Sequence, residues 1–323
     1  MITPLTLHAK IRLPLICGAM YPCSNPELVG AVSAAGGIGI VQPISMTYVH
    51  GHDFRAGVRL AQRIADGNPI GFNALIEESS RYYRNRMERW VAIALEEGIR
   101  FFITSLGKPK WVVDRVTAMG GVVYHDVTAR KWAEKGRDGG VHGLIAVNDR
   151  AGGHAGDTPA EALLDELRPV GLPVVCAGGI GTPAEFRHAL DLGYAGAQLG
   201  TRFIATTECS AHADYKQAII DSSSSDIVLT ERLTGVPVAV INTDYVRRLG
   251  LKAGPVARWM LRGRRTKHWM RTLYALRSLR QLKRDLRVGR GSEEYWQAGR
   301  SVDGIRDIRS AGEVVREFEA AVE

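Results

Sequence analysis

The sequence has few cysteines and no long apolar run, and each shortage excludes a class of protein. Its 323 residues include four cysteines, without the spacing of a zinc site or of a disulfide-rich secreted fold: Cys17, Cys23, Cys176 and Cys209. No apolar stretch approaches the roughly 20 residues that a transmembrane helix needs. The first residues also lack a charged-then-apolar signal pattern. We therefore expect a cytoplasmic protein whose Cys17 and Cys176 are buried free thiols.

Acidic residues are scarce in one part of the chain. The net charge is +8, yet between Arg258 and Arg290 twelve Arg or Lys residues stand against a single acid, Asp285, so the basic character is local. Within this stretch, apolar residues recur every three or four positions from Met270 to Leu286, which predicts a helix with one apolar face.

The role of this basic stretch stays open. It fits a helix packed on the rest of the protein or on a twofold partner, with a solvated basic face. It also fits an electrostatic guide for an acidic substrate or carrier, or a membrane-surface contact. Nucleic acid is the least favoured partner, because no reading motif accompanies the charge. A homodimer is one of the open possibilities.

Eight short apolar runs are each followed by a turn and a helical pattern. Their Val, Ile, Leu and Phe content is typical of parallel strands covered on both faces. The runs are 12–18, 37–42, 69–75, 100–107, 121–127, 143–148, 173–179 and 196–203. Eight strand–helix units predict an α/β fold, a closed (β/α)8 TIM barrel. Capping residues before prolines predict helix starts at Asn25–Pro26, Thr158–Pro159 and Thr182–Pro183.

The pattern changes after the eighth unit, which predicts three parts. Residues 1–220 form the main part of the barrel. Residues 221–300 form a basic, mainly helical region that binds substrate or caps the barrel mouth. Residues 301–323 form a C-terminal segment that returns to the barrel and ends in a helix near 311–322.

Glycines follow the seventh and eighth strands, where barrel enzymes frequently bind phosphate. Gly178 and Gly179 leave strand seven, and Gly200 and Thr201 end strand eight. Exposed backbone N–H groups and the Thr201 hydroxyl favour an anion there. Asn73, at the end of strand three, offers an amide to a flat heterocycle. These residues outline a pocket with a phosphate at one side and a ring at the centre.

The stretch AVNDRAGGHAGDTP, residues 146–159, places His154 behind two glycines at the end of strand six. Histidine titrates near neutrality, so it holds or releases a proton without a large pKa shift. We therefore predict that His154 handles the proton in catalysis. His125, at the end of strand five, fits a ligand contact and a structural role equally well. The sequence predicts no metal site.

Several motifs together resemble the nitronate monooxygenase (2-nitropropane dioxygenase) family, which also includes flavin-dependent NAD(P)H:quinone reductases and enoyl-acyl-carrier-protein reductases. The similarity covers roughly residues 5–220 and adds one C-terminal segment. The motifs are PLICGAM…ELVGAVSAAGGIGIV, PIGFNAL, DRAGGHAG, VVCAGGIGT, AQLGTRFIATTE and YWQAGRSVDGI.

This resemblance implies a barrel that holds FMN without covalent attachment. The backbone of Ala19 and Met20 and the side chain of Asn73 would contact the isoalloxazine ring, and Gly152 and Gly153 would lie near its edge. The phosphate would be held by a set that the strand ends already indicate: Gly178, Gly179, Gly200 and Thr201. His154 falls on the family's active-site histidine, which takes a proton from the carbon next to a nitro group.

Two positions depart from the family pattern. Asp149 and Arg150 precede the AGGH motif, where family members often carry an acid shortly before it. Asp126 stands near the end of strand five, where some relatives have a lysine. Because an acid there would repel a cofactor phosphate, we expect the Asp126 side chain to point elsewhere. Both departures concern the substrate more than the flavin.

Three functions follow from these residues. The first is an FMN-dependent nitronate monooxygenase that oxidises alkyl nitronates or nitroalkanes with O2. The second is an FMN-dependent oxidoreductase that uses NAD(P)H to reduce a quinone or an enoyl thioester of coenzyme A or acyl carrier protein. The lack of a Gly-x-Gly-x-x-Gly fingerprint does not exclude it, since flavin barrels accept a hydride without one. The third is a catalytically silent barrel that binds partners through its basic stretch.

Overall fold

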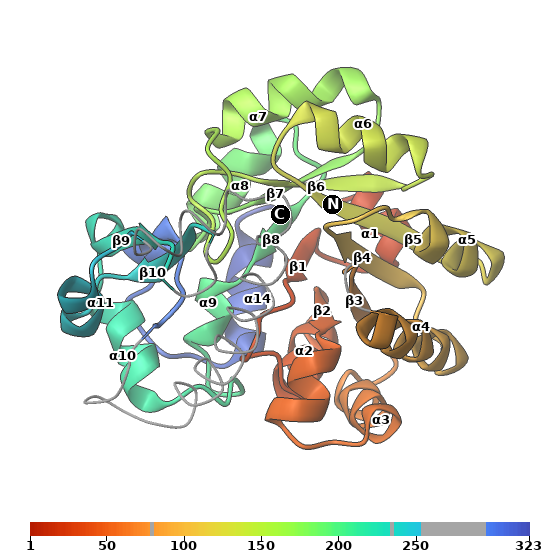
Figure 1. Ribbon diagram of the computed structural model, residues 1–323, viewed down its shortest axis with the longest axis horizontal. Coiled ribbons are helices and arrows are strands. Elements are labelled where there is room, and N and C mark those ends of the chain that lie inside the picture. The colour runs from red at the N-terminus through yellow and green to blue at the C-terminus, as the bar shows by residue number, and fades with distance from the viewer. Residues whose placement is uncertain (78–80, 233–235, 253–294) are drawn as a thin grey trace.

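Eight parallel strands close into a barrel in the computed structural model, which describes residues 1–77, 81–232, 236–252 and 295–323 (Figure 1). Neighbouring strands pair in chain order, and β1 pairs with β8 to complete the circle. The strands are β1 Leu15–Cys17, β2 Ile38–Val41, β3 Gly71–Leu75, β4 Phe101–Ser105, β5 Val122–Val127, β6 Gly143–Val147, β7 Val174–Ala177 and β8 Ala197–Leu199. Each lies within one of the eight predicted runs, so the predicted TIM barrel is confirmed.

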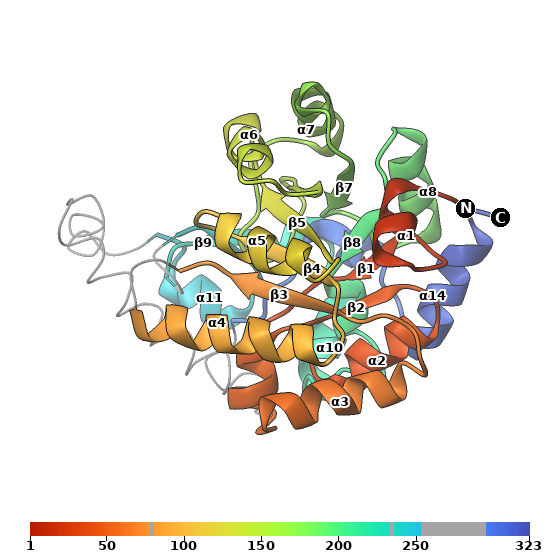
Figure 2. The ribbon, with the colours of Figure 1, turned by 90° about the vertical axis from the view of Figure 1, so that its right-hand side faces the viewer.

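Helices cover the outside of the barrel. Figure 2 shows α6 and α7 above the strands and α2, α3 and α4 below them. The helices of the barrel are α1 Pro4–Ala9, α2 Pro26–Ala34, α3 Phe54–Ile64, α4 Arg81–Glu96, α5 Lys110–Ala118, α6 Arg130–Asp138, α7 Ala160–Leu167, α8 Pro183–Asp191 and the short α9 Thr201–Ile204. None of the helices in these described ranges is long and apolar enough to cross a membrane.

The barrel interior is filled at its lower end. Inward side chains from successive strands, among them Ile16, Ile103, Tyr124 and Ile145, form one buried cluster. Helix α1 closes this end, and Leu5 from α1 belongs to the same cluster. The Tyr124 hydroxyl lies 3.0 Å from Nδ1 of His8, a residue of α1. In the part of the chain that the structure describes, this end is closed to ligands, and the opposite end, where the strands terminate, is where barrel enzymes bind them.

The predicted helix starts meet different outcomes. Thr182 caps α8 in a reciprocal box with Glu185, as its position before a proline predicts. Asn25 precedes α2, but its amide donates to the Glu208 carbonyl at 2.8 Å instead of capping the helix. The start at Thr158 is wrong: Pro159 has extended backbone, and α7 begins at Ala160.

The chain beyond the barrel contains strands as well as helices. After α10 (Ala213–Asp221), β9 (Ile227–Thr230) and β10 (Val238–Ile241) form an antiparallel pair, followed by α11 (Asp244–Leu249). The final helix α14 (Ala311–Ala320) contacts α2 and α8, so the C-terminal segment lies in the helical ring of the barrel. The predicted basic helix at 256–288 falls outside the described residues.

Candidate functional site

The upper end of the barrel interior is open to solvent, in contrast to its lower end. Side chains alternate along each strand, so the positions next in line above the buried cluster also face inward. Among them Asn73, Ser105, Asp126, Val147 and Gln198 are half-buried, whereas the inward residues below them are fully buried. A polar, accessible mouth therefore stands above a dry apolar core.

Several buried polar atoms at this mouth lack a hydrogen-bond partner among the described residues. They are Oδ1 of Asp126, Oδ1 of Asp149, Nε of Arg150 and Oε1 of Gln198. Buried polar groups in proteins are normally satisfied, so such a group points to a missing ligand or water. Three of these atoms are acceptors and one, Nε of Arg150, is a donor, so together they can hydrogen-bond a polar ligand or water.

Contrary to the expectation that it points elsewhere, the Asp126 side chain faces the interior of the barrel. Tyr124, two residues earlier on β5, belongs to the inner cluster, so Asp126 faces the interior as well. Burial raises the pKa of Asp126 to about 7. A carboxyl group with this pKa is largely neutral below pH 7. Asp126 therefore does not repel a nearby phosphate there as an ionised carboxylate would.

Asn148 organises the loop that carries His154. It is fully buried at the end of β6, and its amide Nδ2 donates to the Gly178 carbonyl at 3.0 Å. Its Oδ1 accepts from the backbone N–H of Arg150 at 2.9 Å, and its carbonyl accepts from Gly156 at 3.1 Å. The loop is thus tied to strand seven and to itself, and its glycines do not make it loose.

Distant parts of the chain hold the other side of this loop. The backbone N–H of Ala239, on β10, donates to the Gly153 carbonyl at 2.8 Å. Gly152 packs so closely on Gly299 that a Cβ at Gly152 would lie 2.9 Å from the Gly299 nitrogen. Gly153 has a positive φ of 69°. These contacts explain both glycines without a ligand, so their predicted place at the ring edge stays a prediction.

His154 itself is exposed toward solvent and makes no hydrogen bond or ion pair with another described side chain. The surrounding protein nevertheless lowers the pKa of His154 below its ordinary value, because desolvation disfavours the charged ring. The imidazole is therefore neutral at pH 7 and accessible, as a general base requires.

The glycines of the predicted phosphate site differ in what the fold demands of them. Gly178 and Gly179 have φ of 117° and 77°, and a side chain at either would collide with Asn148 or Arg150. Gly200 has negative φ, and an added Cβ would only reach ordinary contact with Met20 Sδ at 3.4 Å. The fold does not require glycine at position 200, so an approaching ligand is the better explanation for it.

The remaining predicted ring and phosphate contacts lie around this mouth. Thr201 is buried, and its Oγ1 accepts from the Gly299 N–H at 3.0 Å, which leaves the hydroxyl proton able to donate. Met20 uses its own N–H on Ser24 Oγ at 2.9 Å. Ala19 lies half-buried beside the inner cluster. The structure thus brings Met20 against Gly200 and the His154 loop against Gly178 and Gly179.

The other histidine candidates have structural roles. His125 faces outward on β5, and its Nδ1 lies 2.8 Å from Thr104 Oγ1. Burial lowers the pKa of His125 to about 4. His142 accepts from the Val123 N–H, and His212 caps α10. Within the described part of the chain, no group of three or more His, Cys, Asp or Glu residues is arranged to hold a metal.

Sequence reasoning missed the contribution of Gln198. It faces the mouth from β8, where Gly18, the residue after the neighbouring strand β1, leaves room for its side chain. A single polar residue between Ala197 and Leu199 in a short apolar strand was the available signal. The structure also locates Arg150. Its side chain covers Gly179, and its guanidinium lies 3.6 Å from the Glu185 carboxylate.

Comparison with known proteins identifies relatives over nearly the whole chain. The sequence model of the family described as nitronate monooxygenase matches residues 3–320. A Mycobacterium tuberculosis protein named (3aS,4S,5R,7aS)-5-hydroxy-7a-methyl-1-oxo-octahydro-1H-indene-4-carboxyl-CoA dehydrogenase is 26% identical and covers 99% of this chain and 88% of its own. A probable nitronate monooxygenase of Staphylococcus saprophyticus is 24% identical over 76% of this chain and 80% of its own.

Solved structures with the same fold cover the chain completely or nearly so. FabK from Thermotoga maritima superimposes with a TM-score of 0.79 and 25% identity, over 100% of this chain and 97% of its own. A nitroalkane oxidase from Streptomyces ansochromogenes has a TM-score of 0.77 at 22% identity, over 99% of this chain and 98% of its own. The second likeness concerns the fold alone.

Proposed function

Since the chain belongs to the nitronate monooxygenase family, we propose that it is an FMN-dependent oxidoreductase that oxidises alkyl nitronates and nitroalkanes with O2. The observation that carries the proposal is the accessible, neutral His154 at the rim of an open barrel mouth. Its loop is fixed by Asn148 and β10, so the imidazole has a defined place from which to act.

The residues of the mouth fit FMN. Gly200 and Thr201, with the turn at Gly178 and Gly179, would hold the phosphate through backbone N–H groups and a hydroxyl. The side chain of Asn73 would meet the ring from β3, and Ala19 and Met20 would flank it from the end of β1. When bound, FMN supplies a redox centre that accepts electrons from the substrate and passes them to O2.

His154 acts as the base for a nitroalkane. The carbon next to a nitro group is acidic because the nitro group stabilises the charge left by proton loss. A neutral imidazole at pH 7 takes this proton at a ring nitrogen, and the substrate becomes a nitronate. A nitronate supplied directly has already lost the proton and does not need this step.

The flavin and its partners are tested on the purified protein by its visible spectrum and by anaerobic mixing. We expect bleaching, or formation of a semiquinone, with a nitronate. Rapid bleaching by NADH or NADPH in place of this would contradict the monooxygenase proposal and favour a reductase. Absence of any flavin spectrum, even after addition of FMN, would leave only the catalytically silent barrel.

Replacing His154 tests the proton step. We expect His154→Asn to retain FMN but to lower kcat on a neutral nitroalkane by about 100-fold or more, the contribution of one general base. On the corresponding nitronate the loss should stay below about tenfold. Steady-state oxygen consumption on both substrates gives the comparison. Equal losses on the two would rule out proton abstraction by His154.

A second candidate is an oxidoreductase that acts on a coenzyme A thioester. It is favoured by the relative named as a carboxyl-CoA dehydrogenase, which matches the whole length of this chain at higher identity than the monooxygenases. The carbon next to a thioester carbonyl is also a carbon acid, so His154 and the flavin keep their roles. Anaerobic bleaching by a thioester or by NAD(P)H, without bleaching by a nitronate, distinguishes this candidate.

A further inference from the structure

We propose that a cavity between α4 and α5 binds the adenosine phosphate portion of a nucleotide-bearing cosubstrate, the chemistry that coenzyme A thioesters share with NAD(P)H. Its volume is about 380 Å³, within the range of small-molecule sites. The inference rests on the second candidate function, because a nitronate carries no nucleotide.

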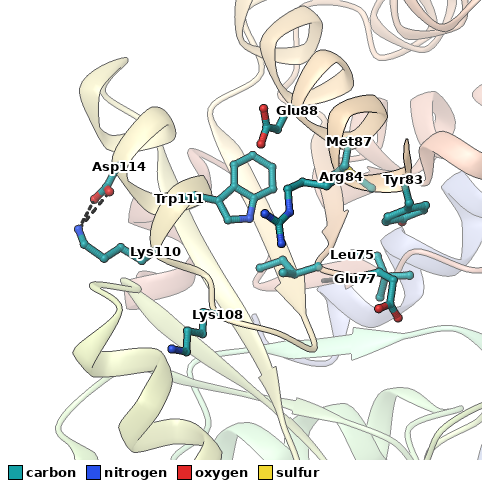
Figure 3. Close-up of a pocket in the computed structure, with 11 residues that line it drawn as sticks. Leu75, Glu77, Tyr83, Arg84, Met87, Glu88, Lys108, Lys110, Trp111 and Asp114 are labelled. Atoms are coloured by element: carbon teal, nitrogen blue, oxygen red, sulfur yellow. Dashed lines mark hydrogen bonds and ion pairs between the residues drawn. The ribbon is translucent and has the colours of Figure 1, made fainter. Parts of the chain in front are cut away.

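The cavity lies at the working end of the barrel. It begins at Leu75, the last residue of β3, and its far wall comes from Lys108 and Trp111, which follow β4 (Figure 3). Asn73, the predicted ring contact, precedes Leu75 by two residues on the same strand, a separation of about 7 Å along an extended chain. A thioester arm or a nicotinamide linked to the nucleotide spans that distance to the mouth.

Two cations of the cavity are left for a ligand. Lys110 is paired with Asp114 at 2.8 Å, and Glu88 with Arg115 at 3.4 Å, so these acids are engaged. Arg84 and Lys108 make no ion pair with any acid in the described ranges. Guanidinium and ammonium groups are the usual partners of phosphate oxygens, and Figure 3 shows Arg84 beside Trp111 and Lys108 at the edge of the cavity, pointing away from Arg84.

The third acid of the lining does not cancel this charge. Figure 3 shows Glu77 on the Tyr83 side of the cavity, whereas Arg84 extends toward Trp111. Burial raises the pKa of Tyr83, and the nearby Glu77 carboxylate raises it further. With Glu88 and Asp114 paired, the part of the cavity near Trp111 stays positive.

Trp111 gives the cavity a surface for an aromatic base. Its indole is half-buried between the core and the cavity, which fixes the ring in place. Arg115 lies 5.3 Å from its centroid and supports it from the helix surface. Bases stack on exposed aromatic side chains in this way because every base has a π face. The proposal places a purine on Trp111, one phosphate on Arg84 and a second phosphate on Lys108 at the edge of the cavity.

The test measures binding without turnover. The FMN-loaded protein is titrated by calorimetry with coenzyme A and, separately, with NADP⁺, neither of which transfers a hydride to the flavin. We expect one of them to bind, and the double variant Arg84→Gln/Lys108→Gln to raise its Kd by about tenfold or more, at least 1.4 kcal/mol. Trp111→Ala should weaken the same ligand independently. The ligand that responds identifies the source of the nucleotide.

Arg63→Gln is the matched control, because Arg63 is exposed near the C-terminal end of α3, at the opposite end of the barrel. It removes one positive charge and should leave the Kd within about twofold. The proposal is overturned if neither ligand binds, if the double variant binds as tightly as the original protein, or if the control weakens binding equally. Since no turnover is measured, this failure is distinct from a failure of the wild-type protein to oxidise its substrate.

Discussion

At the scale of single residues, the glycines of the mouth separate into those that the fold needs and one that it does not. Gly178 has a φ of 117° and would place a Cβ 2.3 Å from Asn148 Oδ1. Gly200 has no such conflict. Since no atom of the described residues and no backbone angle requires glycine at position 200, close approach of a ligand to the backbone is the better explanation for it.

Gly200→Ala tests this distinction. We expect the thermal midpoint of the flavin-free protein to stay within about 2 °C of the original, while the Kd for FMN rises about tenfold or more. Gly178→Ala, the comparison variant, should lose about 1–3 kcal/mol of folding stability because its backbone is strained. Fluorescence titration with FMN and thermal unfolding supply the two measurements. Unchanged FMN affinity in Gly200→Ala would contradict the prediction that the phosphate binds at this loop.

Asp126 gives the protein a pH dependence of known sign. Its pKa rises to about 7 in the folded state, so folding favours the protonated carboxyl, and stability falls as pH rises from about 4 to about 7. We expect Asp126→Asn to lack this loss. Between pH 5 and pH 8, urea unfolding of flavin-free protein should shift in favour of the variant by about 2 kcal/mol.

The exposed Asp138, at the end of α6, is the control for this measurement. Asp138→Asn removes a carboxylate of the same chemistry from the surface, and its stability should follow that of the original protein across the same pH range. If the free energy of unfolding changed with pH equally in Asp126→Asn and the original protein, the prediction would be wrong, and Asp126 would be solvated in the flavin-free mouth.

At the scale of elements, the loop after β6 depends on one side chain. We expect Asn148→Ala to cost about 2–3 kcal/mol in urea unfolding, because it removes a buried side chain and leaves the half-buried Gly178 carbonyl and Arg150 N–H without these partners. Affinity for FMN should fall with it. Asn68→Ala removes an exposed side-chain bond to the Ala65 carbonyl and should cost well under 1 kcal/mol. Similar costs at both sites would mean that Asn148 does not organise the loop.

The strands were predictable and the orientation of their side chains was not. Each strand is a continuous apolar run because both of its faces are buried, and this property makes the eight units visible in the sequence. The same property hides which face is inner, since polar and apolar residues do not alternate. Asp126 was misplaced for this reason, and Gln198 was overlooked. The helix start at Thr158 failed because Pro159 stays outside α7.

The site was predictable where its residues follow a strand, and unpredictable where distant segments meet. His154 and the glycine turns could be predicted because each follows a strand of the barrel. The contact of Gly152 with Gly299, and of Gly153 with Ala239, joins segments far apart in the chain. No local pattern encodes such a meeting, because it depends on how β10 and the segment at Gly299 pack against the barrel.

At the scale of the whole molecule, a ligand that binds only the folded barrel should stabilise it. At a concentration of 100 times its Kd, FMN contributes about 2.7 kcal/mol, and the thermal midpoint should rise by about 5 °C or more. Riboflavin has the same ring without the phosphate and should give a clearly smaller rise. Equal shifts with the two flavins would contradict a phosphate site at the ends of β7 and β8.

The contacts of the His154 loop with Ala239 and Gly299 also set an order of events during synthesis. The eight strands leave the ribosome before the residues that support this loop, since β10 and Gly299 follow the barrel strands in the sequence. Domains acquire structure in the order in which they emerge. A nascent chain that has already closed its barrel would therefore hold the His154 loop through Asn148, without the contacts of the loop to Ala239 and Gly299. The loop would reach its final contacts only when the chain has been translated beyond Gly299.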